Sequence, residues 1–298
     1  MIDVVEKRRL WYLISAIAII PGLISLIVYG INWGIDFTGG TSWELEFQQS
    51  VQSAEVREII SNNSVVQTSG DQNQTVIIRM EELQEGTPEK TAIENDLRAA
   101  FGEFRELQFT TIGPSVGEAI RNRAVISVLI ASAGILIYTA WAFRNTNNPL
   151  LYGACAIVAL LHDAIFVLGV FSILGWAADV EVDALFVTAM LTVIGFSVHD
   201  SIVVFDRIRE NLARRIAPTF EETVNYSVVQ TMVRSLNTSL TVMLTLLALY
   251  LFGGESIRWF VFALLIGVAA GTYSSIFNAS QLLVSWEKGE IQRFFTFW

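Results

Sequence analysis

The stretch Thr192-Val-Ile-Gly-Phe-Ser-Val-His-Asp-Ser-Ile-Val-Val-Phe-Asp-Arg-Ile-Arg-Glu-Asn211 decides the fold. Its first half continues an apolar run that begins near Ala184, and charges become dense only from Asp206. His199 and Asp200 therefore stand inside a hydrophobic helix. An Asp at the centre of a membrane span costs about 2.5–3.5 kcal/mol on insertion scales, so such residues usually face a bundle interior or a water-filled path. The stretch predicts a helical bundle around Asp200 and an ion or proton pathway through it.

The composition of the whole chain is that of an integral membrane protein. Of its 298 residues 53% are hydrophobic, and the mean hydropathy is +0.50, which is too apolar for an ordinary soluble domain. The net charge of −10 lies in residues 31–120, which hold 15 acidic and 5 basic side chains. No excess of positive charge remains to neutralise phosphates, so nucleic-acid binding is disfavoured. The single Cys155 can form no internal disulfide, and its apolar surroundings indicate a buried hydrophobic role.

Six apolar runs are long enough, or nearly so, to span a bilayer as helices. They cover residues 10–30, 124–143, 149–175, 184–205, 236–252 and 257–286. The first is too long for the core of a signal peptide and is expected to be a retained anchor. The sequence thus predicts an α-helical polytopic membrane protein with six transmembrane helices.

Residues 31–120 form the one sizeable polar segment. Alternating patterns predict strands at 41–47, 64–68, 74–80 and 103–112, and amphipathic patterns predict helices at 53–62 and 88–101. The resulting order, β-α-β-β-α-β, is that of a small α+β ferredoxin-like domain. The segment holds neither His nor Cys, and its carboxylates are scattered. A solvated domain surface is a better interpretation than a catalytic site, and a domain that contacts other proteins is compatible with it.

The distribution of Lys and Arg orients the spans, because cytoplasmic loops are enriched in both. One side collects Lys7, Arg8, Arg9, Arg144, Arg207, Arg209, Arg214, Arg215, Lys288 and Arg293. The short loops 176–183 and 253–256 hold only acids, although Arg121, Arg123 and Arg258 flank spans on that side. We therefore expect both termini in the cytoplasm and the 31–120 domain outside it. The expected division is 1–30, 31–120 and 121–298, with a cytoplasmic loop at 206–235 in which Thr219 caps a helix running toward Val233.

Ionisable residues within the spans are the candidate functional site. Asp163 falls near the middle of the third span beside His162, and Asp200 lies about 8 Å to the cytoplasmic side of its span's middle at 1.5 Å per residue. Arg234 opens the fifth span. These depths are compatible with a pair of Asp200 and Arg234 whose making and breaking couples proton binding to conformational change. A static buried network is the alternative.

Other polar residues of the spans have smaller expected roles. Asp163, His162, His199 and Asn237 are the candidates for a secondary polar network. His199 is expected to be a hydrogen-bonding neighbour of Asp200. Asn237 joins Thr241 and Thr245 on one helix face suited to packing against another helix. Adjacent His and Asp side chains point about 100° apart on a helix, so neither His-Asp pair chelates a metal alone. No nucleophile triad, metal site or nucleotide-binding motif appears, and no catalytic role is assigned.

Four motifs resemble those of the SecF family of protein-export membrane subunits. They are Gly34-Ile-Asp-Phe-Thr-Gly-Gly-Thr41, Leu160-Leu-His-Asp163, Val193 to Asn211, and Arg234-Ser-Leu-Asn-Thr-Ser-Leu240. The motifs are long, stand in the family's order and extend over almost the entire chain. The resemblance implies a bundle of the type found in proton-driven RND transporters, set in the cytoplasmic (inner) membrane of a bacterium or archaeon.

The resemblance also implies a function and partners. A SecF subunit pairs with SecD beside the SecYEG channel, with YajC as a frequent companion, and uses the proton-motive force to promote preprotein export. The family's proton-linked Asp maps onto Asp200 and its fifth-helix Arg onto Arg234. Gly34, Asp36, Gly39 and Gly40 are implied to be structural. No resident cofactor is expected; the driving ion is a proton or sodium, since a carboxylate serves either. The rival interpretations are an exporter of small molecules or lipids and a structural scaffold.

Overall fold

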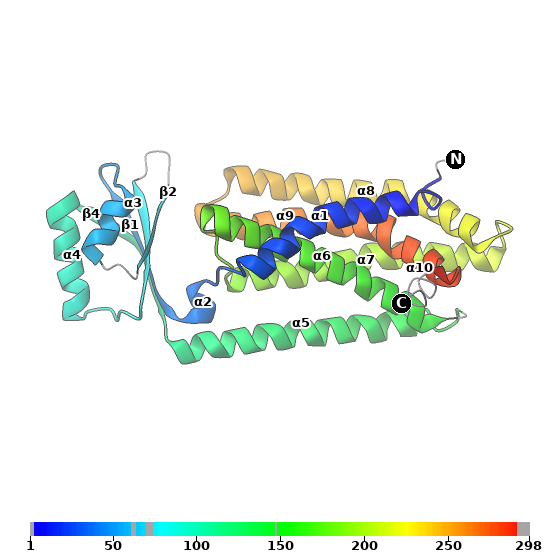
Figure 1. Ribbon diagram of the computed structural model, residues 1–298, viewed down its shortest axis with the longest axis horizontal. Helices are drawn as coiled ribbons and strands as arrows, with labels where there is room; N and C mark the ends of the chain where they lie inside the picture. Colours follow the sequence, from blue (N-terminus) through cyan, green and yellow to red (C-terminus); the bar gives the residue numbers. More distant parts are fainter. Residues whose placement is uncertain (1–2, 61–63, 70–73, 147, 291–298) are drawn as a thin grey trace. The chain divides into compact units, whose positions relative to one another are not determined.

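The computed structural model describes residues 3–60, 64–69, 74–146 and 148–290. The contacts divide the chain into two compact units. One is Trp33–Val125, and the other joins Met1–Asn32 to Ile126–Trp298. Figure 1 labels the helices and strands of both.

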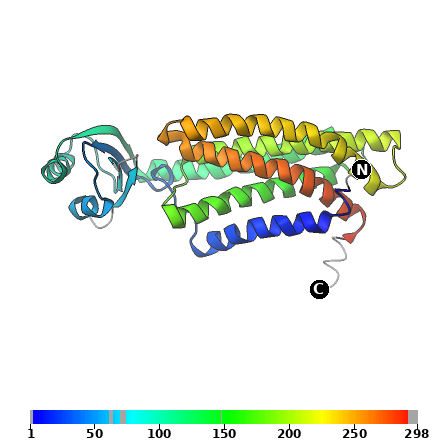
Figure 2. The same cartoon turned by 90° about the horizontal axis from the view of Figure 1, so that it is seen from above.

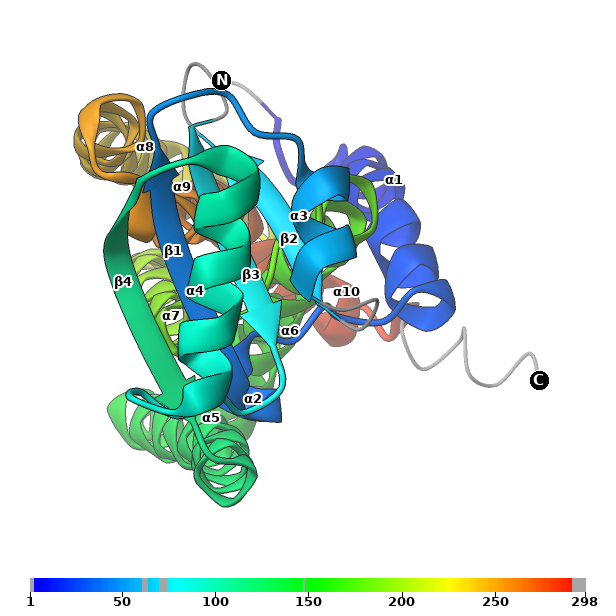
Figure 3. The ribbon, with the colours of Figure 1, turned by 90° about the vertical axis from the view of Figure 1, so that its left-hand side faces the viewer.

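The smaller unit is built on a four-stranded antiparallel sheet. Its elements are α2 (Ile35–Thr38), β1 (Gly40–Phe47), α3 (Ser53–Ile60), β2 (Val65–Ser69), β3 (Thr75–Met80), α4 (Pro88–Phe101) and β4 (Phe104–Ile112). The strands stand in the order β2-β3-β1-β4, and every neighbouring pair is antiparallel. Figure 3 shows α3 and α4 together on one face of this sheet. The ferredoxin-like prediction is therefore confirmed, whereas the last two residues of the helix predicted to Asn62 lie outside the described residues.

Sequence patterns explain how this unit closes. The inward residues of β1, which include Trp43, Leu45 and Phe47, alternate with outward ones and meet Ile78 and Leu97 in a buried cluster. Thr87 caps α4 by accepting a hydrogen bond from the Lys90 amide at 3.3 Å, and Pro88 takes the first helical position. These local signals are the reason that the elements lie so close to their predicted bounds.

Two glycines of the Gly-rich motif are required by the backbone. Gly39 and Gly40 have φ of 75° and 120°, a region that side chains other than glycine rarely adopt. A Cβ on Gly39 would lie 2.8 Å from the Cα of Pro114, and one on Gly40 would lie 2.7 Å from the carbonyl oxygen of Met80. Gly34, by contrast, is extended at φ −70°. The motif thus makes a tight turn between α2 and β1.

Six helical segments are long and apolar enough to cross a membrane, as the sequence predicted. They are α1 (Arg8–Val28), α5 (Pro114–Ala142), α6 (Pro149–Ala178), α7 (Ala184–Arg214), α8 (Phe220–Phe252) and the segment Arg258–Glu287. The last contains α9 (Arg258–Ser274), a π-helical turn at Ser275–Ala279 and α10 (Ser280–Glu287). Figure 2 shows α1 and α6 to α10 packed side by side in the larger unit.

The prediction of a cytoplasmic loop at 206–235 is wrong. α7 continues to Arg214 and α8 begins at Phe220, so only residues 215–219 connect them. The charges that suggested a loop instead form ion pairs along α7, from Arg209 to Asp206 and from Arg207 and Arg214 to Glu210. Pairs at these spacings support an exposed helix. Thr219 does cap α8, accepting from the Glu222 amide at 3.2 Å, but the helix runs past Val233 to Phe252.

The start of α1, the start of α8 and the chain after α10 lie together at one end of the bundle. Arg8 forms ion pairs with Glu221 and Glu290, and Lys288 pairs with Glu221 as well. The amide of Val4 donates to Oδ1 of Asn225 at 2.9 Å. Both described chain ends therefore lie at the same end of the larger unit.

Candidate functional site

Asp200 lies in the middle of α7, turned into the bundle. The residue is only 3% exposed. The Ser239 hydroxyl of α8 donates to its Oδ2 over a long 3.5 Å, and Ser239 in turn accepts from Thr272 of α9 at 2.6 Å. A bond of that length is weak. The carboxylate is therefore buried with little compensation from the described residues.

The ion pair predicted between Asp200 and Arg234 is not formed. Arg234 is exposed, and among the described residues Asp200 is bonded to Ser239 instead. Helical geometry explains the difference, because Ser235 and Ser239 occupy the inward face of α8 and Arg234 is turned about 100° from Ser235. Along α8, Arg234 lies five residues before Ser239, the residue that contacts Asp200. At 1.5 Å per residue it is therefore displaced by about 7.5 Å toward the start of α8.

Two expectations about helix bounds also need correction. α7 is nine residues longer than the predicted span, so Asp200 stands at the middle of the whole helix, while its depth within the apolar run 184–205 stays a prediction. Arg234 does not open a helix, since 14 residues of α8 precede it. The apolar pattern missed these helical extensions because their outer turns are charged or polar.

Asn237 and His199 are not part of a buried network. Both residues are exposed, and Thr241 and Thr245 share the exposed face with Asn237. The face of α8 that packs carries a different stripe of small polar residues, spaced by four and buried: Thr223, Ser227, Thr231, Ser235 and Ser239. The spacing that predicts a packing face is therefore present twice on α8. Within this chain, the stripe from Thr223 to Ser239 is the one that packs against other helices.

Asp163 of α6 is also buried, at 1% exposed, but it is fully bonded. Its Oδ2 accepts from the hydroxyls of Ser197 in α7 at 2.5 Å and Ser274 in α9 at 2.7 Å. Its Oδ1 lies 3.0 Å from Nδ1 of His162. The predicted neighbours Asp163 and His162 thus do contact each other, and the two serines are partners that sequence reasoning missed.

Small residues allow α9 to approach α7 closely beside these carboxylates. A Cβ on Gly271 would lie 2.9 Å from the Cβ of Ser197, and one on Gly267 would lie 2.2 Å from a methyl of Val193. The π-helical turn follows directly, and its first residue, Ser275, donates to the carbonyl of Ser197 at 2.9 Å. Such turns occur often at functional sites. Glycine and serine at 267, 271, 274 and 275 are the sequence signal for this approach.

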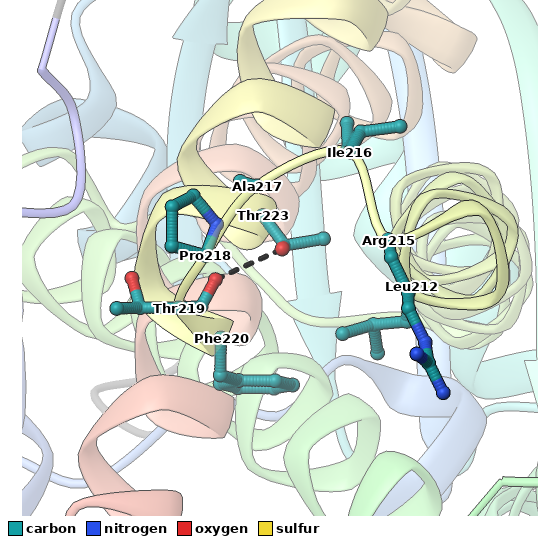
Figure 4. A pocket seen from close by; sticks show the side chains of 8 residues that line it. All are labelled: Leu212, Arg215, Ile216, Ala217, Pro218, Thr219, Phe220 and Thr223. Carbon is teal, nitrogen blue, oxygen red and sulfur yellow. Dashed lines mark hydrogen bonds between the residues drawn. The ribbon is translucent and has the colours of Figure 1, made fainter.

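A cavity of about 550 Å³ lies at the connection between α7 and α8. Figure 4 shows its lining, including Arg215, Ile216 and Phe220, and the 2.9 Å bond from the Thr223 hydroxyl to the Thr219 carbonyl. No acid or histidine lines it. Its chemistry is unsuited to carrying protons, so the candidate site remains the pair of buried carboxylates.

No cluster of three or more His, Cys, Asp or Glu side chains that could hold a metal occurs in the described part of the chain. Cys155 is a free, buried thiol, as its apolar surroundings predicted. The candidate site consists of two carboxylates, one imidazole and the serine and threonine hydroxyls that surround them on α6, α7, α8 and α9. Fold and site together define a multi-pass membrane protein whose helical bundle encloses isolated carboxylates.

The particular family follows from comparison with known proteins. Residues 92–289 match the family model described as protein export membrane protein SecD/SecF, C-terminal, and residues 24–51 match the SecD/SecF GG motif. The chain is 53% identical to the protein translocase subunit SecF of Thermobaculum terrenum over 99% of this chain and 97% of that one. The chain belongs to the SecF family of protein translocase subunits, which serve protein export.

Two further similarities concern fused proteins. The chain is 33% identical to the protein translocase subunit SecDF of Bacillus subtilis, covering 98% of this chain and 39% of that one. The crystal structure of SecDF from Thermus thermophilus, a translocon-associated membrane protein, matches with a TM-score of 0.84 at 31% identity. That match covers 96% of this chain and 39% of the SecDF chain, so the chain spans well under half of the fused protein.

Proposed function

We propose that the chain is the SecF half of a proton-driven export machine and that Asp200 is its coupling carboxylate. The observation that carries this proposal is the environment of Asp200. It is buried at mid-helix, and its one hydrogen bond within the described residues is the long contact to Ser239. A buried carboxylate with so little compensation favours taking up a proton, and protonation then changes what it can bind.

Arg234 supplies the second state in this proposal. It lies on the outward face of α8, five residues before the Ser239 that contacts Asp200. A rotation of α8 by about 100° would turn Arg234 to the inward face, and a shift of about 7.5 Å along the helix axis would bring it opposite Asp200. The charged carboxylate would favour the arginine-facing state and the protonated one the serine-facing state. Alternation between them would move α8 relative to α7.

SecD is the partner that we propose for the exposed arginine. An arginine that faces lipid at the centre of a membrane helix is unfavourable by about 2.5–3.5 kcal/mol on insertion scales, and Arg234, two residues before the apolar run 236–252, meets a smaller penalty of the same kind. A protein surface carrying acceptors would remove that penalty. The relatives in which SecD and SecF are one chain support SecD as a partner of this chain. We further propose contact with SecYEG and YajC and action on preproteins.

The orientation in the membrane belongs to the same proposal. Both described chain ends lie at the end of the bundle where Lys and Arg collect. The positive-inside rule puts that end in the cytoplasm of a bacterial or archaeal cell and the 31–120 domain outside. The chain would act without chemical catalysis or a resident cofactor. The names of its relatives favour protein export over the rival role as an exporter of small molecules or lipids.

The test is export into membrane vesicles that contain the chain together with SecD. Asp200→Asn keeps the shape of the side chain and removes its proton site, so gradient-driven stimulation should fall to the rate seen without a gradient. Asp200→Glu is the matched control and should retain part of it. Imposed proton and sodium gradients in parallel identify the driving ion. Wild-type stimulation in Asp200→Asn at equal protein amount would refute the proposal.

A further inference from the structure

The chain passes from α1 to the smaller unit through a short connection. α1 ends at Val28, and the smaller unit begins at Trp33. The residues between them are held against the α6–α7 hairpin, which comprises the end of α6, the loop 179–183 and the start of α7. Every contact described below lies within the larger unit.

Asn32 is the last residue of the larger unit before the smaller one begins. Its carbonyl oxygen accepts a hydrogen bond from the Val182 amide at 2.8 Å, and its Nδ2 donates to the Asp179 carbonyl at 3.4 Å. Gly175 approaches it so closely that a Cβ at Gly175 would lie 3.2 Å from the Asn32 Cβ. Val182 is buried. These contacts of Asn32 with Gly175, Asp179 and Val182 are called the Asn32 clasp from here on.

The end of α1 is bonded to α6 as well. The Ser172 hydroxyl donates to the Gly30 carbonyl at 2.6 Å and lies 2.8 Å from the Ser25 hydroxyl. Tyr29 stacks on Trp176 with ring centroids 5.0 Å apart. Figure 2 shows α1 alongside α6 in the larger unit. Hydrogen bonds are directional, so they hold a segment in place along the helix axis more firmly than apolar contacts do.

The other connection between the units is α5, and it is held much more weakly. α5 crosses the boundary between Val125 and Ile126. From that boundary to Tyr138 every residue is described, and none is buried. Val128 and Ile135 are partly buried and contact an apolar cluster of the larger unit. Such contacts are non-directional, and packed helices slide against each other across them.

A stiff element joins the Asn32 clasp to Asp200. Asp183 caps α7 by accepting a hydrogen bond from the Phe186 amide at 2.8 Å. α7 is then continuous from Ala184 through Asp200, a rise of about 24 Å at 1.5 Å per residue. A continuous helix passes a displacement along its axis to its end. Val182 therefore moves when Asp200 does.

We propose that the Asn32 clasp makes the smaller unit move with α7 when α8 is displaced against α7. The displacement is the one assigned to Asp200 above, so the mechanical role of the clasp rests on the proposed function. The motion passes through Asn32 rather than through α5, because directional bonds hold the first connection and apolar contacts the second. α8 continues into α9 and not into the smaller unit. A partner bound to the exposed face of α8 would thus be moved relative to the smaller unit.

Distances between spin labels test the proposal without an export assay. The full chain carries Cys155→Ala, because Cys155 is its single cysteine, and is reconstituted in lipid with SecD. Labels are attached through Glu89→Cys in the smaller unit and either Leu185→Cys on α7 or Phe252→Cys at the end of α8, all exposed positions. Adding Asp200→Asn should shift the distance distribution between the smaller unit and α8. The distribution between the smaller unit and α7 should stay as it was.

A flexible insertion distinguishes the two connections. Gly-Ser-Gly-Ser between Asn32 and Trp33 keeps every residue of both units and makes their connection flexible. It should broaden the distribution between the smaller unit and α7 and reduce gradient-driven export to the rate seen without a gradient. The same insertion between Val125 and Ile126 of α5 is the matched control. It should leave that distribution narrow and preserve more than half of the gradient-driven stimulation.

A reversible cross-link tests the clasp in a chain that is already folded. Asn32→Cys and Gly175→Cys would place two Cβ atoms 3.2 Å apart, close to the separation of about 3.5–4.5 Å found in disulfides. Oxidation then fixes Asn32 to the hairpin, and gradient-driven export should be unchanged. Export that stops on oxidation and returns on reduction would overturn the proposal, because the clasp would then have to open.

The label distances separate this inference from the proposed function. Equal broadening by the two insertions would overturn the proposal, as would a distance between the smaller unit and α7 that shifts with Asp200→Asn as much as the distance to α8. If Asp200→Asn leaves gradient-driven export intact, the coupling role of Asp200 fails. The effect of the two insertions on the label distances then still decides whether Asn32 holds the smaller unit to α7.

Discussion

Two carboxylates are buried in the same bundle, but they differ strongly in their hydrogen bonds. Asp163 accepts from two serine hydroxyls at 2.5 and 2.7 Å and contacts His162 at 3.0 Å. Asp200, less than one turn along α7 from Ser197, has the 3.5 Å contact to Ser239. Burial alone therefore does not distinguish the two carboxylates. The number and length of their hydrogen bonds do, because these decide how strongly the charged form is held.

Removing each carboxylate in turn should give the largest difference in unfolding free energy between the two sites. Asp163→Ala leaves two serine hydroxyls and an imidazole without their acceptor, and we expect a loss of about 3–5 kcal/mol in unfolding free energy. Asp200→Ala leaves one weak contact open and should cost less than about 1 kcal/mol. Unfolding of both variants in mixed micelles measures the difference. Equal losses would contradict the distinction.

Deleting one serine hydroxyl beside each carboxylate tests the same difference in hydrogen bonding. Ser197→Ala removes a short bond to a charged acceptor, which is worth about 1.5–3 kcal/mol. Ser239→Ala removes the long bond to Asp200 and should cost about 1 kcal/mol or less. The same micellar unfolding measurement applies, and a larger loss for Ser239→Ala would reverse the assignment.

Because α9 lies close to α7, replacing glycine by alanine should lower stability at their contact and not at an open position of α5. Gly271→Ala puts a Cβ 2.9 Å from that of Ser197, and overpacking of this kind costs about 1–3 kcal/mol. Gly134→Ala on α5 meets nothing within 4 Å. There the higher helix propensity of alanine should stabilise by up to about 1 kcal/mol. Thermal unfolding midpoints should move down for the first variant and not for the second.

The smallest effect is expected at the end of the bundle, far from both carboxylates. The hydrogen bond from Arg8 lowers the pKa of Glu290 below its ordinary value of 4.5. A carboxyl whose folded pKa is depressed adds stability above its unfolded pKa and loses it as pH falls through the folded one. Glu290→Gln should therefore narrow the stability difference between pH 7 and pH 3, measured as thermal midpoints. A variant with the wild-type pH response would show that this contact contributes nothing.

Local sequence signals predicted the elements well. Alternation in β1, the Thr87 cap and the apolar runs predicted the order of elements along the chain and the six spans, because each signal depends on neighbours along the chain. Buried Asp163 and Asp200 were also recognisable, since a carboxylate in an apolar run has to be accommodated. The extent of α7 was not, because the ion pairs that extend it form only once it is helical.

Partners across helices could not be predicted from patterns alone. Arg234 was expected opposite Asp200 from charge, but whether a residue faces inward depends on the rotation of the whole helix. That rotation is set by the stripe from Thr223 to Ser239, which packs against neighbouring helices. Likewise, the bonds from Ser197 and Ser274 to Asp163 join residues far apart in the chain. Nothing in the sequence distinguishes a serine that donates to a buried carboxylate from a serine that is only a small packing residue.

The protonation of Asp200 itself is the most direct test of the account. Infrared difference spectra of the chain with SecD in lipid, recorded between high and low pH, show the band of each carboxyl group that gains a proton. We predict a protonated carboxyl band in the wild type that is lost in Asp200→Asn and kept in Asp163→Asn. A band that persists in Asp200→Asn, or that disappears in Asp163→Asn alone, would contradict the claim that Asp200 is the coupling carboxylate.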